Sequence, residues 1–183
     1  MTATPQATDV VAFWFSECSP QDWFKKSDAF DARLKERFGA LVQQALDGGL
    51  SDWESSFEGC MALILVLDQF TRNIFRDTPK AFSGDPRAIK LSQLCVERGY
   101  MDGQSAAHRQ FMLMPMMHSE VLAVHQSARP LFKEHTDART LDYADQHRVI
   151  IERFGRYPHR NAILGRTSTA EEKVYLSKPG AGF

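Results

Sequence analysis

The stretch CMALILVLDQF, from Cys60 to Phe70, decides the fold of this chain. Every residue up to Leu67 is apolar, so a helix formed here is hydrophobic on all of its faces. A helix of that kind lies at the centre of a packed protein or inside a membrane. Its apolar run is much shorter than the roughly 20 residues that a membrane-spanning helix needs. We therefore predict that residues 60–70 form the central helix of a soluble protein.

Outside this stretch, apolar residues recur with the helical period, and no segment shows the alternation typical of a strand. Thr8 or Asp9 is predicted to cap the first helix, and Ser27 the second. Short turns between short helices favour stacked helical hairpins over one long bundle. The predicted fold is all-α with about seven helices, near residues 8–19, 27–47, 60–70, 85–98, 108–132, 138–154 and 169–176.

Several helix boundaries are marked in the second half of the chain. Asp85 is predicted to cap a helix that has Pro86 in its first turn. Pro115 either kinks one long helix or starts a second one. Thr169 and Glu172 form a capping-box pattern before the last helix. We expect one helical domain over residues 1–183, with an ordered core of about 8–177 and a loose tail over 178–183.

Composition and charge narrow the classes of partner. The 183 residues carry a formal net charge of −1, and 43% of them are hydrophobic. A near-neutral globular chain gives no reason to expect a nucleic acid or an anionic membrane as a partner. Cys18, Cys60 and Cys95 are distant from one another and form no CxxC motif, which favours reduced thiols in the cytoplasm. The amino terminus lacks a signal-peptide pattern, so we expect a cytoplasmic protein.

The first segment that could carry chemistry is DQFTRNIFR, residues 68–76. If the central helix continues, Asp68, Arg72 and Arg76 lie on one face of it. One interpretation is a structural ion pair between Asp68 and Arg72 that fixes the helix end. The other is that one arginine is left over to hold a carboxylate or a phosphate in a bidentate manner.

The second segment is MPMMHSE, residues 114–120. On a helix, His118 and Glu120 point in nearly opposite directions, so they cannot hold one metal ion together. His118 is expected to be a core histidine bonded to a carboxylate or a carbonyl group. Glu120 has apolar neighbours, so it needs a partner, and the surplus arginines are the obvious candidates.

The third segment is HRVIIERFGRYPHRNAILGR, residues 147–166, which is rich in arginine. His147 is predicted on the apolar side of its helix. Arg156, His159, Arg160 and Asn161 fall where Gly155 and Pro158 impose a turn, and turn residues held by rigid helices often form sites. If Pro158 begins a short helix that ends at Gly165, its free backbone amides would add to the positive charge. A purely structural role for these residues is the alternative.

Several catalytic signatures are missing from the sequence. It contains no HExxH zinc motif, no phosphate-binding GxxxxGK[ST] or GxGxxG loop, and no GxSxG nucleophile motif. Ser119 and Cys60 are isolated candidate nucleophiles without a visible base. We therefore expect no metal site and no cofactor.

Together, DQFTRNIFR, the PxxHSE pattern of Pro115–Glu120 and HRVIIERFGRYPHRNAILGRTSTAEEKVYL resemble DUF924, a bacterial family catalogued as a domain of unknown function. The resemblance covers about Asp9 to Leu176. It implies a tetratricopeptide-like right-handed superhelix of paired helices, and it leaves the biochemical role open. It also implies the following signature positions: Asp68, Arg72, Asn73, Arg76, His118, Glu120, His147, Arg156, His159, Arg160, Asn161 and Arg166.

Three hypotheses for function follow, and the oligomeric state stays open in all of them. In the first, the three segments converge on one pocket that binds a small anionic ligand or a peptide carboxylate. In the second, the same pocket is an active site in which Glu120 or a histidine acts as acid or base. In the third, the polar segments are internal braces of a protein-interaction scaffold, whose apolar groove would contain Trp14, Trp23 and Trp53.

Overall fold

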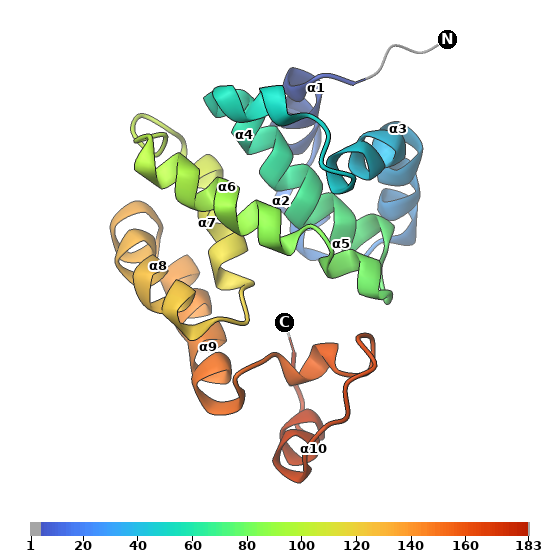
Figure 1. Cartoon of the computed structure of the whole chain (residues 1–183), viewed down its shortest axis with the longest axis vertical. Helices are drawn as coiled ribbons and strands as arrows, with labels where there is room; N and C mark the ends of the chain where they lie inside the picture. The colour runs from blue at the N-terminus through green and yellow to red at the C-terminus, as the bar shows by residue number, and fades with distance from the viewer. Residues whose placement is uncertain (1–4, 183) are drawn as a thin grey trace.

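The computed structural model describes residues 5–182, and all regular elements in this part of the chain are helical (Figure 1). Residues 1–4 and 183, which the predicted domain includes, lie outside the described part. The central helix is continuous over α4 (Phe57–Ile64), the π-helical segment η3 (Leu65–Phe70) and α5 (Thr71–Ile74). All side chains from Cys60 to Phe70 are buried, which confirms the predicted central position. The π-helical segment contains Asp68, and such segments are frequent at functional sites.

The amino-terminal helices pack around this central helix. They are α1 (Ala7–Ala12), which continues into η1 (Phe13–Glu17), α2 (Pro20–Phe24), α3 (Asp28–Leu46) and the short turn η2 (Ser51–Ser55). Gln6 caps α1, so the predicted cap at Thr8 or Asp9 is wrong. Asp9 sits in the first turn instead, and its carboxylate accepts a hydrogen bond from the Gln6 amide at 2.7 Å. Ser27 caps α3 as predicted.

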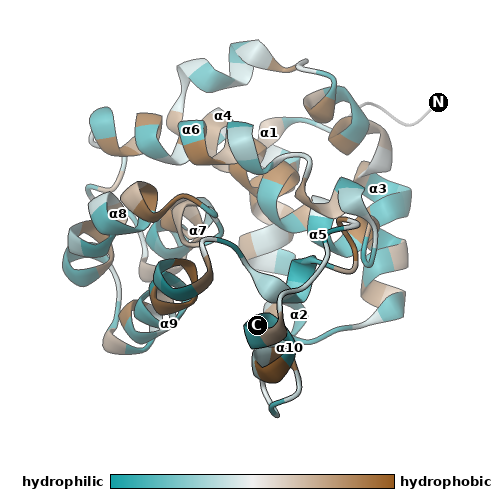
Figure 2. Ribbon diagram, turned by 60° about the horizontal axis from the view of Figure 1, so that its bottom comes forward, coloured by the Kyte–Doolittle hydropathy of each residue, from teal (hydrophilic) through white to brown (hydrophobic). Residues whose placement is uncertain are grey.

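The three tryptophans do not form an exposed groove. Trp14 is fully buried and packs edge-on against Phe111, with ring centroids 5.4 Å apart. Trp23 and Trp53 are half-buried and pack against the same core. The apolar groove of the scaffold hypothesis is therefore wrong for Trp14. In Figure 2, hydrophobic and hydrophilic bands alternate along α3 and α9, as expected for helices with one buried face.

The second half contains α6 (Asp85–Glu97), α7 (Ala106–Met117), α8 (Leu122–His135) and α9 (Ala138–Phe154), and η4 (Pro79–Phe82) precedes α6. From α6 onward, each of these helices packs against the next, which agrees with the predicted hairpins. Pro115 lies inside the last turn of α7 and does not start a new helix. The chain breaks a few residues later, between Met117 and Leu122, because side chains from a distant segment bind the carbonyl groups at the end of α7.

Gly84 permits a close approach between α6 and the central helix. A Cβ atom at this position would lie 2.2 Å from the carbonyl oxygen of Leu67, a distance too short for any side-chain carbon. Gly84 is also the residue that precedes the first turn of α6, so Asp85 is not the cap that the sequence predicts. The carboxylate of Asp85 points to the central helix instead and binds Arg72.

After α9 the chain forms an arm that contains η5 (Pro158–Arg160) and α10 (Ala170–Leu176), and it returns to the body near its end (Figure 1). The short helix that the sequence suggests from Pro158 to Gly165 is reduced to the turn η5, and turns follow it up to Gly165, with the Leu164 amide donating to the Arg160 carbonyl at 2.9 Å. The tail beyond residue 177 makes a further turn, and Gly182 lies against the His159 side chain.

Within residues 5–182, no helix is long and apolar enough to cross a membrane. The right-handed superhelical arrangement implied by the family resemblance stays a prediction.

Candidate functional site

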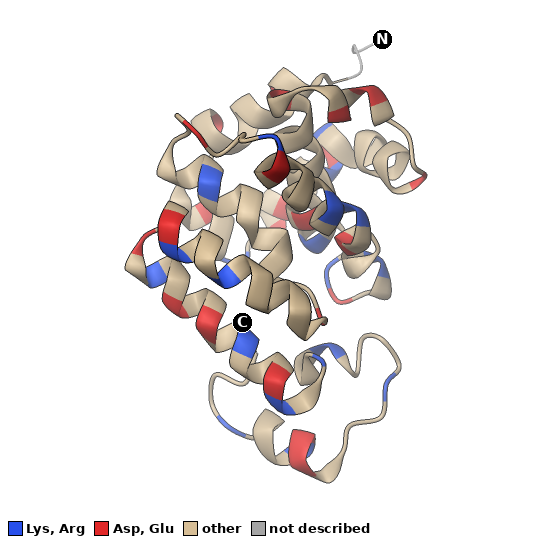
Figure 3. Ribbon diagram, turned by 60° about the vertical axis from the view of Figure 1, so that its left-hand side comes forward, with Lys and Arg blue, Asp and Glu red and all other residues tan. Residues whose placement is uncertain are grey.

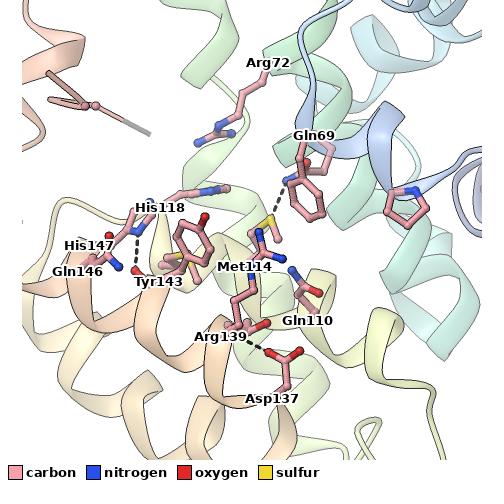
Figure 4. A pocket seen from close by; sticks show the side chains of 16 residues that line it. Gln69, Arg72, Gln110, Met114, His118, Asp137, Arg139, Tyr143, Gln146 and His147 are labelled. Carbon is pink, nitrogen blue, oxygen red and sulfur yellow. Dashed lines mark hydrogen bonds between the residues drawn. The ribbon is translucent and has the colours of Figure 1, made fainter.

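A cavity of about 680 Å³ opens between the central helix, α7 and α9. Figure 4 shows Arg72 and Arg139 directed into it from opposite sides, with His118 and His147 on a third side. Of the twelve predicted positions, Arg72, His118 and His147 line the cavity. Its remaining lining residues are Pro20, Phe24, Gln69, Gln110, Met114, Met117, Asp137, Arg139, Thr140, Tyr143, Gln146, Gly180 and Gly182.

Asp68 lies directly behind the cavity wall and has no exposed surface. Its Oδ1 atom is 2.7 Å from Nδ1 of His118 and 3.1 Å from Nη1 of Arg72, and its Oδ2 accepts a hydrogen bond from Gln69 at 2.6 Å. Burial alone would raise the pKa of Asp68, but His118 and Arg72 more than offset it, so the pKa lies well below its usual range. Asp68 is therefore ionised, and the expected pairing of His118 with a carboxylate is observed.

Arg72 links the central helix to α6. Its Nη1 and Nη2 atoms donate to the two oxygens of Asp85, each at 2.9 Å, and Nη1 also donates to the Asp68 carbonyl at 2.7 Å. The predicted Asp68–Arg72 ion pair is present as well. A guanidinium group has five N–H donors, so these contacts do not use all the donors of Arg72, which also lines the cavity.

Arg160 reaches the same cluster from the arm. It donates to the carbonyl of His118 at 3.1 Å, lies 3.5 Å from Asp85, and its guanidinium packs on the rings of Phe82 and Tyr157. The side chain is 7% exposed, so burial and the nearby Arg72 charge lower its pKa. Arg160 therefore fixes the backbone of His118 without lining the cavity.

Glu120 does not line the cavity, and it lies in the loop after α7, so the predicted geometry of His118 and Glu120 on one helix does not apply. Its two oxygens accept a bidentate pair from Arg166 at 2.7 and 2.9 Å, and Oε1 also accepts from the Tyr157 amide at 2.7 Å. The hydroxyl group of Tyr157 donates to the Met117 carbonyl at 2.6 Å. The arm thus caps the end of α7, and Glu120 is placed as a brace and not as an acid or base in the cavity.

The remaining predicted positions are also paired outside the cavity. Arg156 binds both oxygens of Glu172 at 2.7 and 2.8 Å, and Asn161 donates to the same carboxylate at 3.2 Å. Arg76 and Asn73 both bind Asp31 on α3. Arg76 is therefore not the spare arginine that one interpretation of the sequence requires.

Three histidines surround the buried ring of Tyr157 next to the cavity. His147 has its Nδ1 2.7 Å from the Tyr143 carbonyl, and because a carbonyl can only accept, Nδ1 donates. Burial lowers the pKa of His147 to about 3 and that of His159 to about 4. Burial also lowers the pKa of His125. These rings are therefore neutral at physiological pH.

Arg139 is the basic residue of the cavity lining that the sequence interpretation missed. It lies on α9 with Tyr143 and His147, at positions that share one face of a helix. Its side chain is exposed, its guanidinium lies 5.8 Å from the centroid of the Tyr143 ring, and it forms no ion pair within residues 5–182. The helical spacing from Arg139 to His147 could have indicated this face. In Figure 3, acidic and basic residues are interspersed over the helices. An anion would therefore be bound by single positions such as Arg139 and not by a broad positively charged surface.

The geometry defines an all-helical protein in which three polar segments form an ion-pair network beside a cavity. A family model described as "Bacterial protein of unknown function (DUF924)" matches residues 10–180, so the chain belongs to this family. The chain is also similar to the solved structure of a protein of unknown function from Agrobacterium tumefaciens, with 39% sequence identity and a TM-score of 0.88. That match covers 93% of this chain and 96% of the other. Among curated proteins, none matches the chain significantly.

Proposed function

We propose that this protein binds a small organic anion, such as a carboxylate or phosphate metabolite, in the cavity between the central helix, α7 and α9. The observation that carries the proposal is the presence of two guanidinium groups, Arg72 and Arg139, on the walls of one cavity. A volume of about 680 Å³ is typical of sites for small molecules. Guanidinium groups suit carboxylates and phosphates because they offer planar pairs of donors.

The charges around the cavity favour an anion. Behind the wall, Asp68 and Asp85 balance Arg72 and Arg160. Arg139 adds a positive charge to the lining; it forms no ion pair with a described carboxylate, although its charge lowers the pKa of the nearby Asp137.

The acidic residue in the lining is Asp137, whose carboxylate caps α9 by accepting the Thr140 amide at 2.7 Å. Apolar walls formed by Met114, Met117 and Phe24 strengthen the field of the cations, because they exclude water.

The cytoplasm is the compartment that we propose for this activity. Cys18, Cys60 and Cys95 are all buried and free, which suits a reducing environment. Small carboxylates and phosphates are available to a protein in that compartment.

A thermal-shift experiment tests the binding proposal. The wild-type protein is mixed with succinate, glutarate, citrate or inorganic phosphate at increasing concentrations. A ligand at 100 times its Kd stabilises the folded state by about 2.7 kcal/mol, which raises Tm by roughly 5–10 °C for a domain of this size. Arg139→Gln should abolish the shift without changing the Tm of the free protein.

Lys133→Gln is the matched control, because it removes one exposed positive charge from α8 away from the cavity lining. It should leave the ligand-induced shift unchanged. Equal shifts in the two variants would indicate nonspecific ionic stabilisation, and the absence of any shift in the wild type would contradict the proposal.

A further inference from the structure

The contact between Asp68 and His118 fixes the chemistry of the imidazole ring. Because Asp68 is ionised, it can only accept hydrogen bonds, so Nδ1 of His118 carries the proton in the 2.7 Å contact. The carboxylate cannot turn away, since Gln69 and Arg72 hold both of its oxygens. In the neutral form of this ring, the lone pair is therefore on Nε2.

Nε2 is the ring nitrogen of His118 that the Asp68 contact leaves available. The side chain is 15% exposed and lines the cavity, and Nε2 makes no hydrogen bond within residues 5–182. The backbone of this residue is held in place by Arg160, which donates to its carbonyl. A buried carboxylate that orients a histidine in this way is a common arrangement for a general base.

A cation lies next to this base. Arg72 and His118 contact the same atom, Oδ1 of Asp68, at 3.1 and 2.7 Å. The guanidinium is thus beside the imidazole and can stabilise negative charge that develops on a substrate oxygen. Other charged and titratable groups near His118 come from the surrounding elements: Asp85, His125, His147, His159 and Arg160.

We propose that the Asp68–His118 pair makes this cavity the active site of a hydrolase for esters of small organic acids. The inference rests on the proposed anion site, because Arg139 would hold a second, ionised group of the substrate. His118 is the catalytic residue, whereas Asp68 is a positioning residue that acts through His118.

The reaction proceeds in two steps. Nε2 of His118 accepts a proton from a water molecule while the water oxygen forms a bond to the ester carbonyl carbon. The carbonyl π electrons move to its oxygen, beside Arg72. When the carbonyl re-forms, the bond to the alkoxy oxygen breaks and that oxygen takes the proton from the imidazolium. The products are a carboxylic acid and an alcohol, and the Asp68–His118 pair returns to its starting protonation state.

Water is the nucleophile because, among residues 5–182, no serine, threonine or cysteine side chain is bonded to His118. The Thr140 side chain is buried and hydrogen-bonded to the Asp137 carboxylate. Cys60 is buried in the core, where its thiol donates to the Glu54 carbonyl. Ser119 is buried, and its hydroxyl oxygen accepts the Val121 amide.

An esterase assay tests the proposal with 4-nitrophenyl monoesters of succinate, glutarate and adipate, and with 4-nitrophenyl acetate as a neutral probe. Wild-type protein should release 4-nitrophenolate with saturation kinetics from at least one monoester. His118→Asn keeps a donor near the Nδ1 position but removes the base, so kcat/KM should fall by about 100-fold or more at an unchanged Tm. Arg139→Gln should raise KM for the monoester.

His108→Asn is the matched control, because it tests whether a histidine outside the cavity releases 4-nitrophenolate. His108 stacks on Phe15, with ring centroids 3.9 Å apart, and does not line the cavity. This variant should retain the wild-type rate. Asp68→Asn should lower kcat more than it raises KM, and ¹⁵N NMR should show that His118 loses its Nδ1–H tautomer.

Two results overturn the hydrolase: equal release by wild type and His118→Asn, or no release above buffer from any of the esters. The thermal shift with glutarate separates this failure from failure of the anion site. If glutarate still stabilises the wild type in an Arg139-dependent way, the binding proposal stands and hydrolysis alone is rejected. If glutarate has no effect either, both proposals are rejected.

Discussion

The arm after α9 and the cavity wall are built from the same kinds of residue, but they differ in how those residues are paired. In the arm, Arg156 and Arg166 each form a bidentate pair with a carboxylate. On the cavity wall, Arg139 forms no ion pair within residues 5–182, and the Asp68 contact leaves one ring nitrogen of His118 available. The dense basic segment therefore braces the fold, and a sparser group of polar residues is left free to bind a ligand.

This comparison teaches that charge density along the sequence does not locate a site. The arm donates hydrogen bonds to the Met117 and His118 carbonyl groups at the end of α7 and holds α10 in place, which are structural tasks. A site needs donors whose partners are missing from the protein. The predictions below separate the two regions by stability and by ligand binding.

The largest effect is expected when the network behind the wall is opened. Asp85→Ala leaves Arg72 and Arg160 with one nearby carboxylate between them, so the free energy of unfolding should fall by about 3–5 kcal/mol. Urea denaturation measures this change. Glu17→Ala is the control, because its ion pair with Arg37 is exposed and should be worth less than about 1 kcal/mol. Equal losses would contradict a structural role for the buried network.

Acid should destabilise the region around Tyr157 before it affects the carboxylates. His147 and His159 have folded-state pKa values of about 3 and about 4, below the usual 6.5 or so. At a pH between the folded-state pKa and about 6.5, the unfolded state binds more protons than the folded state. The free energy of unfolding therefore falls as pH falls from about 6.5 towards 4. Each of the two histidines should lower the free energy of unfolding by about 2 kcal/mol between pH 7 and pH 5.

Urea denaturation at the two pH values measures this loss, and His159→Gln should remove about half of it. Glu172, whose pKa is lowered to about 2, stays ionised throughout this window, as does Asp68. Constant stability between pH 7 and pH 5 would contradict neutral, buried histidines next to the cavity.

A smaller effect is expected from a substitution that pushes α6 away from the wall. In Gly84→Ala, the new Cβ meets the Leu67 carbonyl oxygen at 2.2 Å, so stability should fall by about 1–3 kcal/mol or more. Gly39→Ala is the matched control in α3, where the nearest contact is an ordinary 3.7 Å. That variant should gain about 0.5–1 kcal/mol from helix propensity. A tolerated Gly84→Ala would show that the approach of α6 is not tight.

Much of the fold could be predicted from local sequence. The apolar run from Cys60 to Leu67 identifies the central helix, and Ser27 and the Thr169–Glu172 capping box mark helix starts correctly. The break after α7 could not be predicted, because it depends on Tyr157 and Arg160, which bind the Met117 and His118 carbonyls from far along the chain.

The candidate site was predictable only in part, for the same reason. The Asp68–Arg72 pair follows from helical spacing. The carboxylates that occupy Arg76 and Arg156 are Asp31 and Glu172, and nothing local in the sequence indicates those pairings. Arg76 and Arg156 are neutralised by these distant carboxylates, so the polar residues of the cavity wall are left as the candidate site.

The most direct test of the account compares Arg139→Gln with Arg156→Gln in one pair of measurements, Tm of the free protein and affinity for the stabilising anion. Arg139→Gln should keep the wild-type Tm and lose affinity, because it acts on the cavity alone. Arg156→Gln should lower Tm and keep the wild-type affinity, because it releases Glu172 and α10. The reverse pattern, with anion binding lost in Arg156→Gln and retained in Arg139→Gln, would place the site in the arm and contradict the account.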